Sequence, residues 1–485
     1  MVVRIVLFAL FVVGSAVAGG LTEKHRYVTG DASLKASTMT LLPWIGGAHG
    51  CAILLVALSW LVAAHVPRKA LIFVALMLSF VGYLNTLFLL TFLVPLYALS
   101  DHTAFWIVAA PFIYLSLAIL IQLLSLVIPR LRSKPYLLLV SWPASFYFSS
   151  VFLSIPVLWI IRMIPSPYGS LVLLLPLVLA LIGLRQSLVH NLEVFDINVR
   201  PSTSLPTLKR LPYSTTTTAS RATREDRGLL EENPDAGSLG DPERSLTIVQ
   251  ITDPHLGPFL SSERLHSICE EVVAHQPDLV LLTGDFFTLE GEKTPGALSK
   301  ALAPLRPLEG RLFACLGNHD VESKEAREVT NRELAEAGVT LLVNREVIVD
   351  VPNKGKVQVV GVDYYPRSSR HRVTEVCKGL PPREDCPRRV VMLHDPHCFH
   401  LMDPNDGGLV FSGHTHGGQL GLVSLGLPDF TMVGLAGPAN GFWGLGKNRN
   451  YIGRGQGCRF LFGNFLIRLG VPTETSVITF HWRGD

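Results

Sequence analysis

The chain has 485 residues, of which 48% are hydrophobic, and its mean hydropathy is +0.36. This composition is too apolar for one soluble globule, so part of the chain is expected to lie in a membrane. The 42 basic and 39 acidic residues leave a net charge of only +3, which indicates no broad basic surface and therefore no nucleic-acid partner.

The first 185 residues carry the apolar character of the chain. Residues 1–20 combine Arg4 with an apolar stretch and small residues, a pattern that fits either a first transmembrane helix (a signal anchor) or a cleaved signal peptide. Residues 41–185 are expected to form a helical membrane region of four or five spans, because a spanning helix needs roughly 20 apolar residues. The apolar runs are 41–66, 70–99, 103–129, 136–161 and the shorter 168–184.

The basic residues of the short loops predict how this region is oriented. Seven of them fall on one side of the membrane and four on the other. The first set is Arg4, Arg68, Lys69, Arg130, Arg132, Lys134 and Arg185, and the second is Lys24, Arg26, Lys35 and Arg162. The positive-inside rule then predicts a multi-pass integral membrane protein whose C-terminal half is cytosolic. The orientation would invert if run 168–184 did not span.

The predicted spans contain no aspartate or glutamate. A proton relay or ion path would need such residues, so an anchoring bundle is favoured over a transporter.

A polar segment separates the membrane region from the rest of the chain. Residues 201–244 are rich in Ser, Thr, Pro and charge, and are expected to form a disordered linker or insertion. Before it, residues 194–199 alternate like an edge strand that belongs to the following domain. Residues 245–485 alternate β-rich runs with helical stretches, which predicts an α/β domain.

The seven cysteines form no CxxC pair and are expected to be mostly reduced thiols. Cys377 and Cys386 flank a short Pro-rich loop and would be bridged only if the domain faced an oxidising lumen.

Polar side chains with ligand chemistry follow five of the predicted strands. They are Asp253 and His255, then Asp285, then Asn318 with His319 and Asp320, then His394, then His414 and His416. Any one of these motifs alone is more often a turn or a cap. The ordered set of five indicates a site, because the carboxyl ends of neighbouring strands meet at one edge of a sheet.

Asp, Asn and His side chains without a thiolate suit divalent cations such as Mn, Fe or Zn. Seven such side chains are too many for one ion. Two ions about 3.5 to 4 Å apart that share one carboxylate would accommodate them, and would form the clamp needed for displacement at phosphorus.

These motifs resemble those of the calcineurin-like metallophosphoesterase superfamily. They read T-D-P-H-L-G from Thr252, T-G-D from Thr283, G-N-H-D from Gly317, H-D-P-H from His394 and S-G-H-T-H-G-G-Q from Ser412. The last motif, with Y-I-G-R-G-Q-G from Tyr451, is similar to the membrane-associated branch of that superfamily. The resemblance implies a four-layer αββα sandwich around two sheets, joined here to a multi-span helical region.

The same resemblance implies how the site residues divide between two divalent ions. One ion would be held by Asp253, His255, Asp285 and His416, and the other by Asp285, Asn318, His394 and His414. A hydroxide bridging the ions would be the nucleophile. His319 would protonate the leaving oxygen or stabilise charge on the phosphoryl group, and Asp320 would orient the imidazole of His319.

Several nearby residues have plainer interpretations. The glycines at 284, 317, 413, 417 and 418 are expected to permit sharp turns rather than to contact substrate. Arg454 is a candidate for binding a substrate phosphate, although a structural arginine fits as well. Thr288 stands where many members of the superfamily have an aspartate, a change expected to affect the loop or substrate preference. His397 and His400 fit the strand end less well than His394 does.

The sequence therefore predicts a membrane-anchored enzyme that hydrolyses phosphomonoesters or phosphodiesters. Its partners would be the bilayer and a phosphate-ester substrate, with a lipid-linked substrate as one class that suits the tether. The alternative is a catalytically silent scaffold with the same fold. Such proteins usually lose metal ligands, whereas all seven ligand positions are filled here, which disfavours this alternative.

Overall fold

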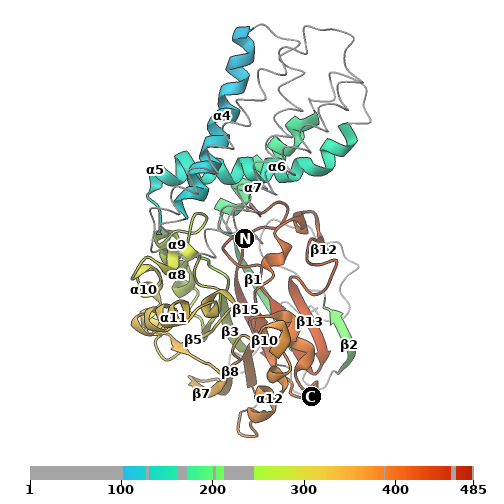
Figure 1. Cartoon of the computed structure of the whole chain (residues 1–485). Helices are drawn as coiled ribbons and strands as arrows, with labels where there is room; N and C mark the ends of the chain where they lie inside the picture. Colours follow the sequence, from blue (N-terminus) through green and yellow to red (C-terminus); the bar gives the residue numbers. More distant parts are fainter. Residues whose placement is uncertain are drawn as a thin grey trace. The chain divides into compact units, whose positions relative to one another are not determined.

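The computed structural model describes residues 102–126, 130–161, 172–199, 204–211, 245–386, 388–459 and 466–482 (Figure 1). The predicted segments 1–20, 41–66 and 70–99 lie outside these ranges. The chain divides into two compact units, Met1–Pro129 with Ser133–Ile182, and Arg130–Arg132 with Gly183–Asp485.

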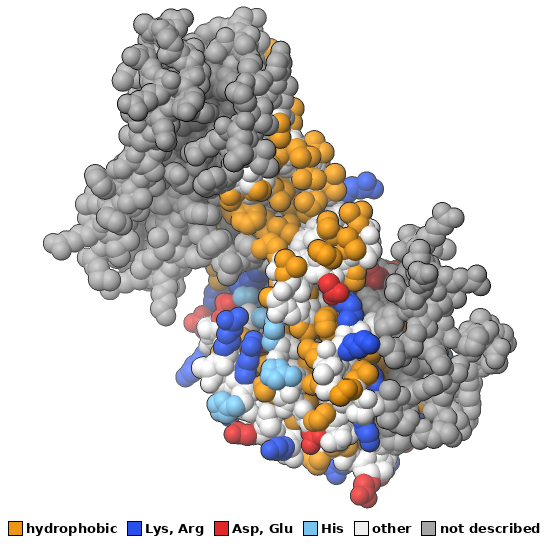
Figure 2. Space-filling view, turned by 90° about the vertical axis from the view of Figure 1, so that its right-hand side faces the viewer, with side chains coloured by type: hydrophobic (Ala, Val, Ile, Leu, Met, Phe, Trp, Pro, Cys, Tyr) orange, Lys and Arg blue, Asp and Glu red, His pale blue; other side chains and the backbone are white. Residues whose placement is uncertain are grey.

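Apolar helices make up the described part of the first unit. α4 spans His102–Ser125, and α5 (Lys134–Tyr136) continues through a π-helical turn (Leu137–Ser141) into α6 (Trp142–Ile161). Among the described residues, two helical stretches, Trp106–Ser125 and Lys134–Val157, are long and apolar enough to cross a membrane. Hydrophobic side chains gather on the surface of the apolar helices (Figure 2), as expected of a membrane or protein contact.

The predicted span 168–184 corresponds in part to α7 (Leu174–Leu188), which has 15 residues. This is shorter than the roughly 20 residues of a spanning helix. Its last residues, from Gly183, belong to the second unit.

The second unit is built on two main sheets. The six-stranded sheet has the order β1-β15-β3-β4-β5-β6, and the seven-stranded sheet has the order β2-β13-β14-β10-β9-β8-β7. The first consists of β1 (Leu192–Val199), β15 (Thr475–Trp482), β3 (Ser245–Ile251), β4 (Leu279–Thr283), β5 (Leu312–Cys315) and β6 (Thr340–Leu341). The second consists of β2 (Leu205–Arg210), β13 (Gly441–Gly446), β14 (Asn448–Ile452), β10 (Leu409–Ser412), β9 (Arg388–Met392), β8 (Gly355–Gly361) and β7 (Arg345–Val351).

Helices cover the outer face of each sheet. α8 (Ser262–Ala274), α10 (Ala297–Leu302) and α11 (Lys324–Glu336) share a hydrophobic cluster with the six-stranded sheet. α12 (Arg372–Gly379) and the 3-10 helix Pro396–Leu401 share another with the seven-stranded sheet. Shorter elements are α9 (Leu289–Glu292), the 3-10 helices Ala303–Leu308, His319–Val321, Arg367–Ser369, His416–Gly418 and Val423–Leu425, and the hairpin of β11 (Gly421–Leu422) and β12 (Leu427–Thr431).

A third hydrophobic cluster joins the inner faces of the two sheets. β4 shows why: all five of its residues are buried, with Leu279 and Leu281 in the cluster between the sheets and Val280 and Leu282 in the cluster under the helices. Alternate side chains of a strand point to opposite faces, so a continuously apolar strand is buried on both. The predicted α/β domain with two sheets is therefore confirmed, and its layers run helices, sheet, sheet, helices.

The prediction of a linker from 201 to 244 is wrong for residues 205–210, which form β2 and pair antiparallel with β13. Most of this strand is exposed, so its sequence (LPTLKR) carries no alternation of apolar and polar residues. β1 covers the predicted edge strand 194–199 and pairs in parallel with β15. Cys377 and Cys386 are free thiols.

Candidate metal centre

Both sheets bring the carboxyl ends of strands to the same place. Asp253 and His255 follow β3, Asp285 follows β4, and Asn318 follows β5 in the six-stranded sheet. His394 follows β9, and His414 and His416 follow β10 in the seven-stranded sheet. The structure thus gathers the seven side chains that the sequence predicted as ligands.

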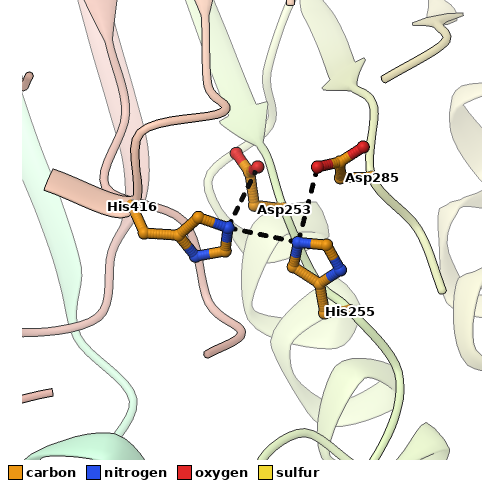
Figure 3. A group of neighbouring side chains, drawn as sticks. All are labelled: Asp253, His255, Asp285 and His416. Atoms are coloured by element: carbon orange, nitrogen blue, oxygen red, sulfur yellow. Dashed lines mark hydrogen bonds and ion pairs between the residues drawn. The ribbon is translucent and has the colours of Figure 1, made fainter. Parts of the chain in front are cut away.

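The first group consists of Asp253, His255, Asp285 and His416, all buried, whose ligand atoms lie within 4.8 Å of one another (Figure 3). The two imidazole Nε2 atoms of His255 and His416 are 3.1 Å apart. Each also faces a carboxylate at 3.5 Å, Asp285 Oδ2 for His255 and Asp253 Oδ1 for His416. Four donor atoms therefore converge on one point.

The second group consists of Asp285, His394 and His414, with Asn318 beside them. Asp285 Oδ2 lies 3.4 Å from His394 Nε2. The side-chain oxygen of Asn318 lies 3.3 Å from His394 Nε2 and 2.7 Å from His414 Nδ1. Asp285 is the one residue common to both groups, as expected of a carboxylate shared by two cations.

Backbone carbonyls orient three of the imidazoles so that Nε2 faces the groups. The Nδ1 atoms of His255, His416 and His394 lie 3.3, 3.4 and 2.6 Å from the carbonyl oxygens of Phe287, Gly457 and Thr283. A carbonyl accepts only from a protonated Nδ1, which leaves a lone pair on Nε2 in the neutral ring. The Nε2 lone pairs of His255 and His416 would then repel each other at 3.1 Å unless a cation lay between them, so these residues fit a metal ion.

Burial keeps two of the imidazoles in the form that binds a metal, whereas a third, His394, is protonated without an ion. Burial alone lowers the pKa of His394, but the negative charge of Asp285 outweighs this effect and raises it to about 10. Burial is the largest cause that lowers the pKa of both His255 and His416 well below the ordinary value, so both rings are neutral. Burial by itself raises the pKa of Asp285, but the charges of His394 and His319 outweigh this effect. The pKa of Asp285 is therefore well below its ordinary value, and this carboxyl is ionised. Burial raises the pKa of Asp253 to about 6. Neutral imidazoles and an ionised carboxylate are the forms that ligate metals.

The backbone at the site is strained. Nine non-glycine residues among those described have a positive φ angle, and five of them are site residues. The five are Asp253 (47°), His255 (42°), Asp285 (57°), His414 (69°) and His416 (52°). Such conformations cost of order 1–3 kcal/mol each and persist where the surrounding structure holds them, which is characteristic of functional sites.

Two glycines leave room beside candidate ligand carboxylates, Gly413 between the two sheets and Gly317 within the six-stranded sheet. A Cβ atom at Gly413 would lie 2.0 Å from Thr252 Oγ1 and 2.2 Å from Asp253 Oδ2, and one at Gly317 would lie 2.2 Å from Asp285 Oδ1. The sequence predicted sharp turns at these positions, but what both require is space beside a ligand carboxylate.

His319 lies beside both groups, but the predicted role of Asp320 is wrong. His319 Nδ1 pairs with Glu322, and its Nε2 lies 4.0 Å from Asp285 Oδ2. The buried carboxylate of Asp320 instead accepts hydrogen bonds from the backbone N–H groups of Asp285, Phe286 and Gly317. Asp320 therefore holds the loop that carries Asp285, and Glu322 orients His319.

The prediction that Arg454 binds a substrate phosphate has no support in the structure. Its side chain is buried, and its guanidinium pairs with Glu193 and with Glu474, the latter at 3.0 Å. Arg459, an arginine that the sequence did not single out, lies beside the candidate metal centre. Together with His319 and Glu322 it lines a small cavity beside the site, and its Nη2 lies 3.6 Å from Glu322 Oε1.

The other residues discussed from sequence lie outside both groups. Thr288 caps α9, accepting from Gly291 N–H and donating to the Leu256 carbonyl at 2.7 Å. His397 is bound to Asp395, and His400 is exposed on the 3-10 helix Pro396–Leu401.

Comparison with known proteins agrees with this geometry. Residues 246–418 match the family model Calcineurin-like phosphoesterase. The phosphodiesterase YaeI of Escherichia coli is 29% identical over 233 residues, a match that covers 48% of this chain and 80% of YaeI. The UDP-2,3-diacylglucosamine pyrophosphatase LpxG of Chlamydia trachomatis is 26% identical over 267 residues, covering 44% of this chain and 78% of LpxG.

A transmembrane protein with metallophosphoesterase domain from Danio rerio is also similar. It is 30% identical over 189 residues, a match that covers 38% of this chain and 43% of that protein. Each of these three matches covers less than half of this chain, and the family model lies within its C-terminal half.

Proposed function

We propose that this chain, whose residues 246–418 match the calcineurin-like phosphoesterase family model, hydrolyses phosphate esters at the two residue groups that share Asp285. That match and the relatives named as a phosphodiesterase and a pyrophosphatase support a metal-dependent hydrolase of phosphoric esters. The observation that carries the proposal is the shared carboxylate: Asp285 lies in both groups, so two divalent ions (Mn, Fe or Zn) would be held side by side.

In this proposal Asp253, His255, Asp285 and His416 hold one ion, and Asp285, Asn318, His394 and His414 hold the other. When bound, the ions supply Lewis acidity and lower the pKa of water, which makes a nucleophile available at neutral pH. The chain itself contributes fixed imidazoles, whose carbonyl partners keep each Nε2 lone pair aimed at the ions. Burial of the site removes competing water and strengthens each of these contacts.

His319 is the residue proposed to handle the proton of the leaving group. Its Nδ1 is held by Glu322, so its Nε2 is directed toward Asp285 and the space where a phosphoryl group would lie. Its side chain is 20% exposed, which lets it reach a substrate that enters from solvent. A protonated Nε2 can stabilise charge on a phosphoryl oxygen and then protonate the leaving oxygen.

We also propose that the enzyme is held at the cytosolic face of a membrane as a multi-pass protein. Two described helical stretches of sufficient length and apolarity support the membrane association, together with the similarity to a transmembrane relative. The cytosolic side rests on the basic residues of the short loops and requires that run 168–184 spans, where the structure describes the 15-residue helix α7. A lipid-linked phosphate ester is the substrate class that suits this placement, and LpxG, a pyrophosphatase of UDP-2,3-diacylglucosamine, shows that a relative acts on such a molecule.

The test is hydrolysis of bis-p-nitrophenyl phosphate and p-nitrophenyl phosphate by the full chain in detergent with added Mn²⁺. The full chain is needed because β1 and β2, which precede residue 245, complete the two sheets. Asp285→Ala should abolish the activity, whereas Asp350→Asn, which changes an exposed aspartate on β7, should leave it unchanged. Equal rates for wild type and Asp285→Ala would refute the enzyme proposal.

A further inference from the structure

A second surface of the C-terminal domain exposes several large apolar side chains to solvent. The segment 420–436, which we call the apolar hairpin, contains β11 and β12 and follows the last histidine motif directly. Six of its large apolar side chains are between 41% and 79% exposed, namely Leu422, Leu425, Leu427, Phe430, Met432 and Leu435. Such a concentration of exposed apolar side chains marks a contact surface.

The apolar hairpin carries almost no charge. Asp429 is the one ionisable residue between 420 and 436, and Arg210 on β2 binds its carboxylate at 2.6 Å. A surface that binds a protein normally has an apolar centre surrounded by a polar rim. A surface with one neutralised charge instead suits contact with the boundary between the headgroups and acyl chains of a bilayer.

The hairpin is rigidly connected to the metal centre. Gly418, two residues after His416, packs so closely that a Cβ atom there would lie 2.6 Å from Thr431 Oγ1 in β12. Met432 N–H donates to the Leu420 carbonyl at 3.0 Å, and Gly434 N–H donates to Thr431 Oγ1 at 2.8 Å. The position of the hairpin is thereby fixed relative to the ligand loop.

The hairpin is also attached to the carboxyl end of the apolar helix α7. Gln186, in the last turn of α7, accepts a hydrogen bond from Gly470 N–H at 2.7 Å. The Gly470 carbonyl in turn accepts from Ser424 N–H at 2.9 Å, and Ser424 Oγ lies 3.5 Å from Gln186 Nε2. The apolar hairpin is therefore hydrogen-bonded to the last turn of α7.

We propose that the apolar hairpin inserts its exposed side chains into the interfacial layer of a lipid bilayer, and so holds the metal centre at the membrane surface. The inference rests on the proposed membrane association and adds a second point of contact to it. Its basis is threefold: the row of exposed apolar side chains, the absence of free charge, and the hydrogen-bonded attachment to α7. A substrate with a lipid anchor would then reach the site without leaving the bilayer.

Photo-crosslinking of the full chain in the membranes of expressing cells tests this. p-Benzoylphenylalanine is incorporated in place of Leu425 or Leu435, and adducts on the purified chain are identified by mass spectrometry. The matched control is Ile348, an exposed apolar residue on β7, at the edge of the seven-stranded sheet. Phospholipid adducts should be about tenfold more abundant at the hairpin positions than at the control. Adding Leu422→Asp and Phe430→Asp to the Leu425 variant should reduce them.

Two outcomes would overturn the proposal. Equal phospholipid adducts at Ile348 and at the hairpin would show no specific contact, and adducts with a protein, including a second copy of this chain, would show a different occupant. Protease resistance of each variant checks that it is folded. Because adduct formation does not depend on catalysis, failure to hydrolyse bis-p-nitrophenyl phosphate would affect the proposed function and leave the crosslinking result interpretable.

Discussion

The two sheets contribute different chemistry to the site. The six-stranded sheet supplies every oxygen donor among the seven candidate ligands, Asp253, Asp285 and Asn318, together with one imidazole, His255. The seven-stranded sheet supplies imidazoles alone, those of His394, His414 and His416. The negative charge of the site thus comes from one sheet, and most of its nitrogen donors come from the other.

This difference teaches that neither sheet carries a metal centre by itself. Asp285, on the six-stranded side, contacts His255 of its own sheet and His394 of the other. His414 N–H in turn donates to both carboxylate oxygens of Asp253 at 3.0 Å. The packing of the two sheets and the binding of ions should therefore depend on each other.

The sharpest way to test this comparison is to remove the shared carboxylate. Asp285→Asn should lower kcat on bis-p-nitrophenyl phosphate by about a thousandfold, because it weakens both groups and removes the charge that both ions require. His416→Ala should deplete one ion and His394→Ala the other. Metal content by mass spectrometry after desalting separates the three cases.

Asp285→Asn is expected to retain fewer ions per chain than either histidine variant. If all three variants lost the same amount, the two groups would not be separate sites joined at Asp285. Asp350→Asn serves as the control for the loss of a surface charge.

The next largest effect should come from the contact between the sheets. Gly413→Ala places a Cβ atom against Thr252 and Asp253, so it should push β10 away from β3 and lower the free energy of unfolding by about 3 kcal/mol. The temperature of thermal unfolding and the metal content should decrease together. Gly379→Ala, at the end of α12 where a Cβ atom would meet nothing within 4 Å, should change neither. Loss of stability with full metal retention would contradict the coupling of packing and ion binding.

Much of this architecture follows from the sequence because it depends on strand ends. Apolar runs such as 279–283 predict buried parallel strands, and polar residues directly after them predict where ligands meet. The seven side chains brought together are those that the sequence singled out, since the strand order places their carboxyl ends side by side.

What the sequence did not predict depends on contacts between distant residues. From the sequence, Arg454 is a candidate phosphate ligand. In the structure it is buried and paired with Glu193 and Glu474, and a pairing of this kind between distant residues has no signal in the local sequence. β2 has no apolar alternation because most of it is exposed. The pairing of His319 with Glu322 was the exception, since a spacing of three residues in a helical turn is a signal that could have found it.

A smaller effect should follow from changing a residue that belongs to neither ligand group. His319→Ala should lower kcat on bis-p-nitrophenyl phosphate by about a hundredfold, because proton transfer to the leaving oxygen is lost. Metal content should stay at the wild-type level, since Nε2 of His319 faces Asp285 at 4.0 Å without joining either cluster. Loss of metal in this variant would mean that His319 is a ligand, and the division of labour between the sheets would need revision.

The smallest effect should come from the residue that orients His319. Glu322→Gln keeps the size of the side chain but removes its charge, so the imidazole should lose part of its fixed direction and kcat should fall about fivefold. The effect is limited because the Glu322 side chain is 56% exposed, so that solvent screens its interaction with His319. Glu325→Gln, three residues further along the chain and paired with Lys293 instead, is the matched control and should leave kcat unchanged. If Glu322→Gln lowered kcat in wild type and equally in a His319→Ala background, Glu322 would act through something other than His319, and Arg459, whose Nη2 lies 3.6 Å from its carboxylate, would be the residue to test.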